Sequence, residues 1–518
     1  MPIEFVTSEK VTVDYVNRSR SLKKVFPRHF TDPDLRKFSI DRELLVDKLL
    51  EYNTQVGAPQ RVKENIESLL QNNTHAVITG QQPGLFSGPI YAIYKAISAI
   101  IACERLSTSE YSLVPVFWNA SEDHDFSEVN HIGLFKENEL HEIRYDNVST
   151  ELPLSHVALD KEKMKTMLTA IGDVSPETEF KAKLLEEIQE LIADSLTVGD
   201  FYSKIMINLF GDNGLILVEP HYFRRLMCPI FERLVRRPTE CTRILNDAGM
   251  QLRRLGYSPR IHKRPDICNF FFINDEGKRE RVAYNGQFVT ATQVFSQKEL
   301  LDVLDTDPSR FSANAVIRPV TQDLLFPTFA YIAGPNETAY LAQLKPIYDF
   351  FAVEMPVVVP RFGVTIVERK VSKVLEKYRV GIQDLRNPEK FLKDLAKEEL
   401  DGVFKPFKSE VAKSIAEVTQ RAESIDPTLT GSCTLAQGRI LKSIDALENK
   451  LASRLKEQNT LIKEQIAKAH DNIFPRGQLQ ERQINILEYL IKFGREFLRV
   501  VFENLRDADY GEHRVIKW

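Results

Sequence analysis

The chain has 518 residues, more than one hydrophobic core normally serves, so two or three domains are expected. Hydrophobic residues make up 43% and charged residues 27%, as in ordinary globular proteins. Proteins that bind nucleic acid through its phosphates usually carry an excess of positive charge, whereas this chain has a formal net charge of −4. We therefore expect no nucleic-acid partner.

No apolar run approaches the ~18 residues of a membrane span, and the first residues lack the basic-then-apolar pattern of a signal peptide. We therefore expect a cytoplasmic protein without a membrane partner. The cysteines are odd in number and form no CxxC pair, which predicts neither a zinc ribbon nor a disulfide framework. They are Cys103, Cys228, Cys241, Cys268 and Cys433.

Residues 1–75 are predicted to be a helical segment packed on the core, because apolar residues recur every three or four positions over 39–50 and 61–70. From residue 76 the pattern changes to a short strand over 76–79, a buried helix over 89–106 and a second strand over 113–118. This order predicts a βαβ unit with a parallel sheet.

Further strands and helices extend this unit into an α/β core over residues 76–365. We expect strands over 215–218, 315–320, 331–333 and 357–360, and helices over 161–195, 202–211 and 221–248. Insertions near 132–200 and 250–312 interrupt the core.

From about residue 366 we expect no more strands. We predict a helical arm over residues 366–473, because two apolar stripes over 404–425 and 440–466 flank a turn of sequence DPTLTGS at 426–432. Two such helices form an antiparallel hairpin, or coiled coil, of the kind that most often holds a second copy of the same chain. Residues 474–518 have their own stripe and are expected to return to the core; it contains Ile484, Ile486, Leu487, Tyr489 and Leu490.

The stretch VITGQQPGLFSGPIYAIYK, residues 77–95, joins the first strand to its helix. The strand delivers the chain to the carboxyl edge of the sheet, where ligands bind in open α/β folds. Gly80, Gly84 and Gly88 permit positive φ and close backbone approach, while Ser87 and Pro89 suit an N-cap and a first helical turn. The helix N-terminus is then a ready site for phosphate or carboxylate.

Four polar side chains strengthen this candidate site. Gln81 and Gln82 add amide groups, and Tyr91 and Lys95 lie four residues apart on one helix face. The stretch is neither a Walker A nor a GxGxxG motif. A tight turn with a capped helix and no ligand is the alternative, and both remain open.

A second polar group follows the strand that ends at Trp118. The segment NASEDHDFSEVNH, 119–131, places ionisable groups side by side at a strand end, and a histidine flanked by carboxylates suits proton transfer or binding of a substrate ammonium. The spacing requires no metal site, although His124, Asp125 and His131 could form one. A solvated loop is the alternative. The candidates are Trp118, Asn119, Glu122, Asp123, His124, Asp125 and Asn130.

A third group lies between residues 315 and 361, where a strand, a Gly-Pro turn and a helix repeat the same arrangement. Arg318 and Arg361 could clamp carboxylates with bidentate hydrogen bonds, and each could equally form a surface ion pair. Gly334, Glu337 and Tyr340 come from the turn and its helix.

Two short stretches resemble class I aminoacyl-tRNA synthetase signatures. Residues 131–134 read HIGL and residues 370–373 read KVSK. The first follows the second strand rather than the first, and the second lies in a charged helix. With an acidic net charge and no evident anticodon-binding module, a tRNA synthetase or tRNA-modifying protein is disfavoured.

Five long motifs resemble, in order, those of the bacillithiol-biosynthesis cysteine-adding enzymes, a family of cysteine ligases. They are TGQQPGLFSGPIYAIYK (79–95), PVFWNASEDHDFSEVNH (115–131), RPVTQDLLFPTFAYIAGPNETAYLAQLKPIYDFF (318–351), MPVVVPR (355–361) and FPRGQLQERQINIL (474–487). The likeness covers essentially the whole chain. Where the family has GPGE, this chain has GPNE at 334–337, and Asn336 still tolerates positive φ.

The resemblance implies a Rossmann-like core related to class I synthetases and other nucleotidyl transferases, with helical insertions and a coiled-coil arm that supports a homodimer. It also implies a reaction that joins the carboxyl group of cysteine to the amino group of glucosaminyl-malate, giving bacillithiol. By analogy with synthetases, ATP or another nucleotide, alone or with Mg²⁺, is expected to activate the cysteine carboxyl group.

On this hypothesis, the glycine turn holds phosphate or a substrate carboxylate, and Lys95 neutralises negative charge. His124 acts as a general base or positions a phosphate, and Asp123 and Asp125 orient it or bind the cysteine ammonium. Arg318 and Arg361 take the malate carboxylates. The rival is a catalytically inactive nucleotide-binding scaffold whose arm recruits another enzyme of the thiol pathway.

Overall fold

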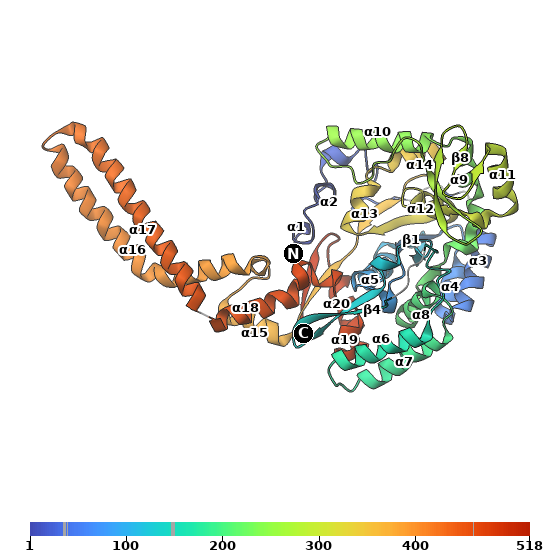
Figure 1. The fold of residues 1–518 in the computed structure, drawn as a ribbon, viewed down its shortest axis with the longest axis horizontal. Coiled ribbons are helices and arrows are strands. Elements are labelled where there is room, and N and C mark those ends of the chain that lie inside the picture. Colours follow the sequence, from blue (N-terminus) through green and yellow to red (C-terminus); the bar gives the residue numbers. More distant parts are fainter. Residues whose placement is uncertain (35–37, 39, 147–150, 459) are drawn as a thin grey trace. The chain divides into compact units, whose positions relative to one another are not determined.

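The computed structural model describes residues 1–34, 38, 40–146, 151–458 and 460–518 (Figure 1). The chain folds into two compact units. The first comprises residues 1–365 and 481–516, and the second comprises residues 366–480 and 517–518. The chain therefore leaves the first unit after residue 365, builds the second, and returns at residue 481 to complete the first, before its last two residues join the second.

A five-stranded parallel sheet forms the centre of the first unit, in the order β12-β11-β1-β2-β5. Its strands are almost wholly buried, as the continuous apolar runs of a sheet covered on both faces require. The prediction of a Rossmann-like α/β core is confirmed. The strands are β1 (Thr74–Gln81), β2 (Ser112–Asn119), β5 (Ile216–Val218), β11 (Thr328–Ala333) and β12 (Val357–Pro360).

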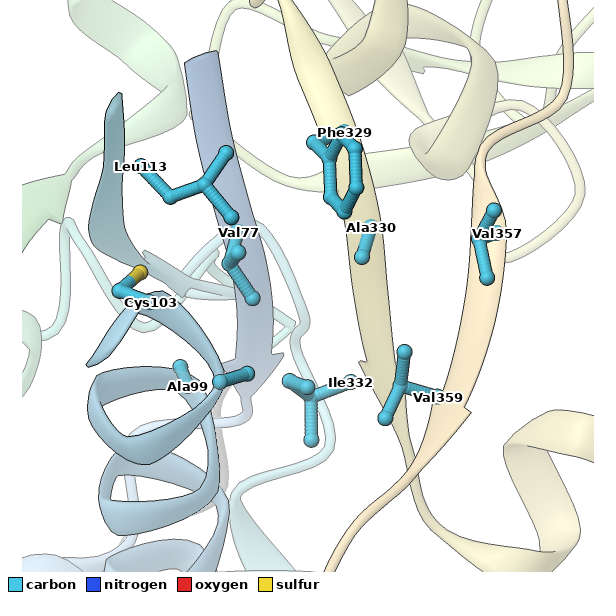
Figure 2. Packing of buried hydrophobic residues seen from close by; sticks show 10 residues of the cluster. Val77, Ala99, Cys103, Leu113, Phe329, Ala330, Ile332, Val357 and Val359 are labelled. Carbon is cyan, nitrogen blue, oxygen red and sulfur yellow. The ribbon is translucent and has the colours of Figure 1, made fainter. Parts of the chain in front are cut away.

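Helix α5 (Tyr91–Leu106) connects β1 to β2 and packs on the sheet, as the βαβ pattern predicts. Figure 2 shows the resulting core, in which Ala99 and Cys103 of the helix face Val77 and the side chains of β11 and β12. Every residue of this cluster is at most 7% exposed.

The predicted N-cap of α5 is wrong. Ser87 lies in a short 3-10 turn (Leu85–Ser87) with φ of +79°, and the helix begins only after Ile90. The cause is Asn485, whose side-chain amide donates to the carbonyls of Phe86 at 2.9 Å and Gly88 at 2.7 Å. These bonds hold the loop away from the path of a helix.

Most predicted helices are present. They correspond to α3 (Arg42–Gln55), α4 (Gln60–Ser68), α6 (Lys161–Val174), α7 (Lys181–Asp194), α8 (Val198–Phe210), α9 (Arg224–Arg236) and α10 (Glu240–Arg254). Residue 39, where the first of these was expected to begin, lies outside the described residues. Two short helices, α1 (Ile3–Val6) and α2 (Lys10–Val16), precede them.

The strand expected over 315–320 is wrong, because this segment turns into helix α12 (Arg318–Leu325). The side-chain oxygen of Asn314 accepts hydrogen bonds from the backbone N–H groups of Val316 and Ile317, and this starts the helix. Helices α13 (Pro335–Leu341) and α14 (Lys345–Phe351) follow β11.

Both insertions contain antiparallel strands that the sequence did not predict. The later one forms a five-stranded sheet in the order β10-β6-β7-β8-β9. Helix α11 (Gln297–Thr306) follows β9 in the chain. The earlier one contains a hairpin of β3 (His131–Lys136) and β4 (Glu139–Arg144), so the HIGL stretch is a strand. The strands of the later sheet are β6 (Ile267–Ile273), β7 (Arg279–Tyr284), β8 (Phe288–Val289), β9 (Val294–Phe295) and β10 (Phe311–Ala313).

The second unit is helical, and the predicted hairpin is confirmed. Helices α16 (Pro388–Glu423) and α17 (Thr430–Gln458) run side by side (Figure 1), joined by the turn Pro427–Leu429. Lys408 of α16 pairs with Glu448 of α17 at 2.6 Å. The unit also contains α15 (Arg369–Tyr378), which includes the KVSK stretch, and α18 (Thr460–Ile473).

The C-terminal segment adds α19 (Leu487–Phe493) and α20 (Glu496–Arg506) to the first unit, and its predicted apolar stripe is buried. Strand β13 (Gly363–Val367) lies at the end of the predicted core, but β14 (His513–Lys517) shows that the expectation of no strands after about 366 is wrong. Across the described part of the chain, no helix combines the length and apolar character needed to cross a membrane.

Candidate functional site

A cavity of about 870 Å³ opens at the carboxyl edge of the parallel sheet, where open α/β folds bind their ligands. Three parts of the sheet contribute to its wall: the β1–α5 connection, the loop after β2 and the β11–α13 turn. The later insertion, the segment that leads into α12, the end of β12 and the C-terminal segment supply the rest. Of the predicted site residues, the cavity is lined by Gly80, Gln81, Gln82, Tyr91, Lys95, Glu122, Asp123, His124, Arg318, Gly334, Glu337, Tyr340 and Arg361.

The glycines of the first loop serve close packing more than positive φ. A Cβ atom on Gly80 would lie 2.6 Å from the Trp118 carbonyl oxygen, and one on Gly84 would lie 2.6 Å from the Cα atom of Gly88. Only Gly88 has a positive φ, of +67°. Gly84 and Gly88 pack against each other outside the cavity wall, and the Ile90 amide already donates to the Ile484 carbonyl. The structure therefore does not present these residues as a phosphate cradle.

Lys95 and Glu337 form a buried ion pair at the centre of the site, with Nζ 2.6 Å from Oε2. Lys95 is 2% exposed and also donates to the Gly80 carbonyl at 2.5 Å and to Gln81 Oε1 at 3.2 Å. Burial lowers the pKa of Lys95, although the Glu337 carboxylate opposes this. The charge of Lys95 is thus matched inside the protein.

Two hydrogen-bond donors hold the Glu337 carboxylate in addition to Lys95. The Gly334 amide donates to Oε2 at 2.8 Å, as in a capping box, and the Tyr331 hydroxyl donates to Oε1 at 2.8 Å. Burial alone would raise the pKa of Glu337, but Lys95 and Arg318 hold it below its ordinary value. The carboxylate therefore stays ionised and anchors the network.

Arg318 is the cation of this network that has no matching carboxylate. Its guanidinium donates to the Tyr340 hydroxyl at 2.8 Å and to the Tyr331 hydroxyl at 3.4 Å, and no carboxylate of the described residues lies within 4.0 Å. Burial would lower the pKa of Arg318, but the two tyrosine oxygens and Glu337 keep it above the ordinary value. Arg318 is therefore a fixed positive charge facing the cavity, suited to an anionic ligand.

Arg361, in contrast, is already engaged. Its guanidinium holds Glu481 in a buried two-point contact, at 2.5 Å and 3.0 Å, and donates to the Phe362 carbonyl at 2.8 Å. It is thus a poor candidate for a carboxylate clamp. The neighbouring Arg482, which the sequence reasoning missed, is exposed, lines the cavity and lies 5.7 Å from the centre of the Tyr91 ring.

Asp123 joins the loops that follow β1 and β2. Its Oδ2 accepts a hydrogen bond from Gln82 Nε2 at 2.5 Å, and its Oδ1 accepts one from the His124 amide at 2.8 Å. The Nδ1 of His124 lies 3.8 Å from Oδ1, and Arg279 approaches the same oxygen to 4.0 Å. A histidine on a carboxylate at the cavity wall is an arrangement suited to proton transfer.

Several predicted residues lie outside the cavity wall. Trp118 is buried in the sheet, and Asn119 donates to the Gly199 carbonyl at 3.1 Å. Asp125 accepts from Ser127 at 2.6 Å, and Asn130 donates to the Tyr145 carbonyl at 3.4 Å. Their roles in this structure are local. Glu122 does line the cavity, but its carboxylate is paired with the buried Arg224.

The later insertion supplies residues that the sequence reasoning missed. Cations in the stretches HKRPD and KRER, residues 262–266 and 278–281, face the cavity, and a sequence signal existed in these two basic runs. In the whole lining, eight lysines and arginines stand against three carboxylates, which suits a ligand with several negative charges. The eight are Lys95, Lys263, Arg264, Arg279, Arg281, Arg318, Arg361 and Arg482; the three are Glu122, Asp123 and Glu337.

No metal site follows from the described side chains, because nowhere among them do three His, Cys, Asp or Glu residues converge on one point. The donors of the cavity suit a different class of ligand. Guanidinium and ammonium groups bind phosphates and carboxylates, so the site suits a ligand that carries such anionic groups.

Comparison with known proteins identifies close relatives of this chain. A family model described as the N-terminal Rossmann-like domain of the bacillithiol biosynthesis protein BshC matches residues 1–362, and one described as its C-terminal coiled-coil domain matches residues 364–518. A protein of Salinibacter ruber is 33% identical over 92% of this chain and 89% of its own length. Proteins of Bacillus cereus and Bacillus cytotoxicus are each 32% identical over 99% of this chain and 98% of their own length. All three are named "Putative cysteine ligase BshC".

We predict that Glu481→Gln lowers the free energy of unfolding of the first unit by about 3 kcal/mol, because it leaves the Arg361 guanidinium buried without a counter-charge. Chemical denaturation followed by tryptophan fluorescence measures this, since Trp118 lies in the sheet. Arg482→Gln is the matched control, with an exposed side chain next in sequence, and should change stability little. Equal effects of the two substitutions would contradict the importance of the buried pair.

The Arg361–Glu481 pair also predicts how the free energy of unfolding changes with pH. Burial would raise the pKa of Glu481, but Arg361 holds it below the ordinary value of 4.5. Its stabilising contribution is therefore complete above that value and is lost as the pH falls through the lower native pKa. Acid titration of the Gln variant should show a shallower loss of stability.

Proposed function

The chain belongs to the BshC family of bacillithiol biosynthesis, and we propose that it is a ligase that joins the carboxyl group of cysteine to the amino group of glucosaminyl-malate. The observation that carries this proposal is the cavity at the sheet edge, in which a histidine–carboxylate pair and a surplus of cations face one space. The first suits proton transfer and the second suits substrates with phosphate or carboxylate groups.

The reaction needs an activated carboxyl group, because an amide does not form readily from a free carboxylate and an amine in water. We propose that ATP or another nucleotide supplies the activation, as an adenylate or an acyl phosphate. Arg264, Arg279 and Arg281 provide the positive charge that would hold its phosphates. Magnesium could accompany the nucleotide, bound mainly through the phosphates.

Within the cavity we assign substrate-binding roles to the cations that have no carboxylate partner in the protein. Arg318, with the Tyr340 hydroxyl beside it, would bind one malate carboxylate, and Arg482 replaces Arg361 as the candidate for the other. Asp123 would orient His124, which takes part in acid–base chemistry or positions a phosphate. Lys95 and Glu337 would keep the β1 and β11 ends in register around the substrates.

The direct test is a mass-spectrometric assay with purified protein, cysteine, glucosaminyl-malate, ATP and magnesium that follows bacillithiol, AMP and ADP together. We expect bacillithiol with an equal amount of AMP if an adenylate forms, or of ADP if an acyl phosphate forms. Substrates that bind without giving product, with nucleotide present, would contradict the ligase and favour a binding scaffold.

His124→Ala should lower kcat by about 10²–10⁴-fold, the usual effect of losing a placed acid–base group. His141→Ala is the matched control, since His141 lies on β4 outside the cavity lining and should leave kcat unchanged. Full activity of the His124 variant in the same assay would remove this residue from the mechanism.

We also propose that the hairpin of α16 and α17 holds a second copy of the chain. Large apolar side chains remain exposed along it, including Val403, Phe407, Val418, Leu435 and Leu447. Such a stripe is typical of a helix–helix interface. Light scattering should give the mass of a dimer, and replacing Phe407 and Val418 by Glu should give a monomer; an unchanged mass would contradict the proposal.

A further inference from the structure

Lys263 lies on a loop of the later insertion whose backbone is held in place by side-chain amides. Asn246 of α10 bonds both backbone groups of Lys263, accepting from its N–H at 3.1 Å and donating to its carbonyl at 2.8 Å. Gln343 accepts from the amides of Arg260 and Ile261 at 2.7 and 2.8 Å. Gln343 also donates to the Ile261 carbonyl at 2.8 Å, so five backbone groups of the loop are fixed, and with them the position from which the Lys263 side chain extends.

The side chain of Lys263 reaches the cavity with few partners. Its Nζ donates to Asn269 Oδ1 at 2.8 Å, and Asn269 is in turn held by the Thr242 hydroxyl at 2.6 Å. Within the described chain no carboxylate lies within 4.0 Å of this Nζ, unlike Lys95, Lys204 or Lys278. An ammonium group has three donors, so the ammonium of Lys263 has N–H groups left for a ligand in the cavity.

The titratable groups facing Lys263 come from three elements: Cys241 on α10, Cys268 on β6 and Arg281 on β7. Burial raises the pKa of both thiols to about 12, so neither supplies a negative charge near neutral pH. Burial likewise lowers the pKa of Lys263 to about 8, and the Arg281 cation acts in the same direction. Burial, the Arg281 cation and the absence of a paired carboxylate among the described residues therefore all favour the neutral amine of Lys263 over its ammonium form.

We propose that Lys263 is the proton acceptor for the attacking amine, a role that rests on the proposed ligase function. The ammonium group of the acceptor gives a proton to the neutral Nζ of Lys263. The freed electron pair forms the C–N bond to the activated cysteine carboxyl carbon, and the C–O bond to the phosphate breaks with its electron pair on that oxygen. The nitrogen then gives its second proton to the departing phosphate oxygen, which leaves a neutral amide. A proton acceptor whose pKa lies near the working pH is efficient, and His124 is then left to position the phosphate.

A labelling experiment tests the state of Lys263 without reference to catalysis. Purified protein is acetylated briefly with acetic anhydride at pH 6 to 10, and peptide mass spectrometry gives the extent at each lysine. We expect a labelling midpoint near pH 8 for Lys263. The control is Lys278 on the same insertion, whose ion pair with Glu276 raises its pKa, so its midpoint should be higher. Coincident midpoints would overturn the proposal.

Kinetics of Lys263→Met and Lys263→Arg test the role in the reaction. Both should lower kcat by about 10²–10⁴-fold with little change in KM, and both should lose the rise of rate with pH through about 8. Arginine keeps the positive charge but does not release a proton, so a variant of near-normal kcat would show an anion-binding group and overturn the proposal. Thermal unfolding of both variants identifies any failure to fold.

Different results would overturn the ligase function and the role of Lys263. A wild-type protein that forms no bacillithiol overturns the proposed function, and with it the reaction assigned to Lys263, even where labelling shows a neutral amine. Product formation that is unaffected in both Lys263 variants leaves the ligase intact and overturns only the proton acceptor.

Discussion

The buried ion pair of Lys95 and Glu337 determines how the site is built. Lys95 belongs to the helix that follows β1, and Glu337 belongs to the helix that follows β11, so the pair ties together two strand–turn–helix units of one sheet. Two buried charges need close geometry and further hydrogen bonds to offset their desolvation, and here Gly80, Gln81, Gly334 and Tyr331 provide them. The cavity opens beside this fixed point.

Charge matching then separates structural from available cations. Lys95 and Arg361 each form an ion pair with a buried carboxylate, whereas Arg318 donates to tyrosine hydroxyls and Arg482 lies beside an aromatic ring. An unmatched guanidinium at a cavity wall is costly unless an anion binds there. The sequence alone does not reveal this distinction, because all four are simply basic residues.

The sheet was predictable because apolar runs, glycine-rich turns and the order of strands are local features. The polar cluster around Asp123 and His124 was predictable for the same reason, since both follow a strand directly. Arg361 was misjudged because its partner, Glu481, lies 120 residues further along the chain. Ser87 was misjudged because Asn485, from the same distant segment, fixes its loop. The insertion wall was missed because short antiparallel strands carry a weak pattern, and its Lys263 faces the cavity only once β6, β7 and α10 are assembled.

The division of the first unit into residues 1–365 and 481–516 has a consequence for synthesis on the ribosome. Arg361 emerges 120 residues before Glu481, which at roughly 5–20 residues per second amounts to about 6–24 s without its counter-charge. The hairpin is made entirely within that interval. The parallel sheet, complete in strands by Pro360, must therefore wait for the end of the chain before its buried arginine is neutralised. The site is therefore completed only when the C-terminal segment has been synthesised and has packed onto the first unit.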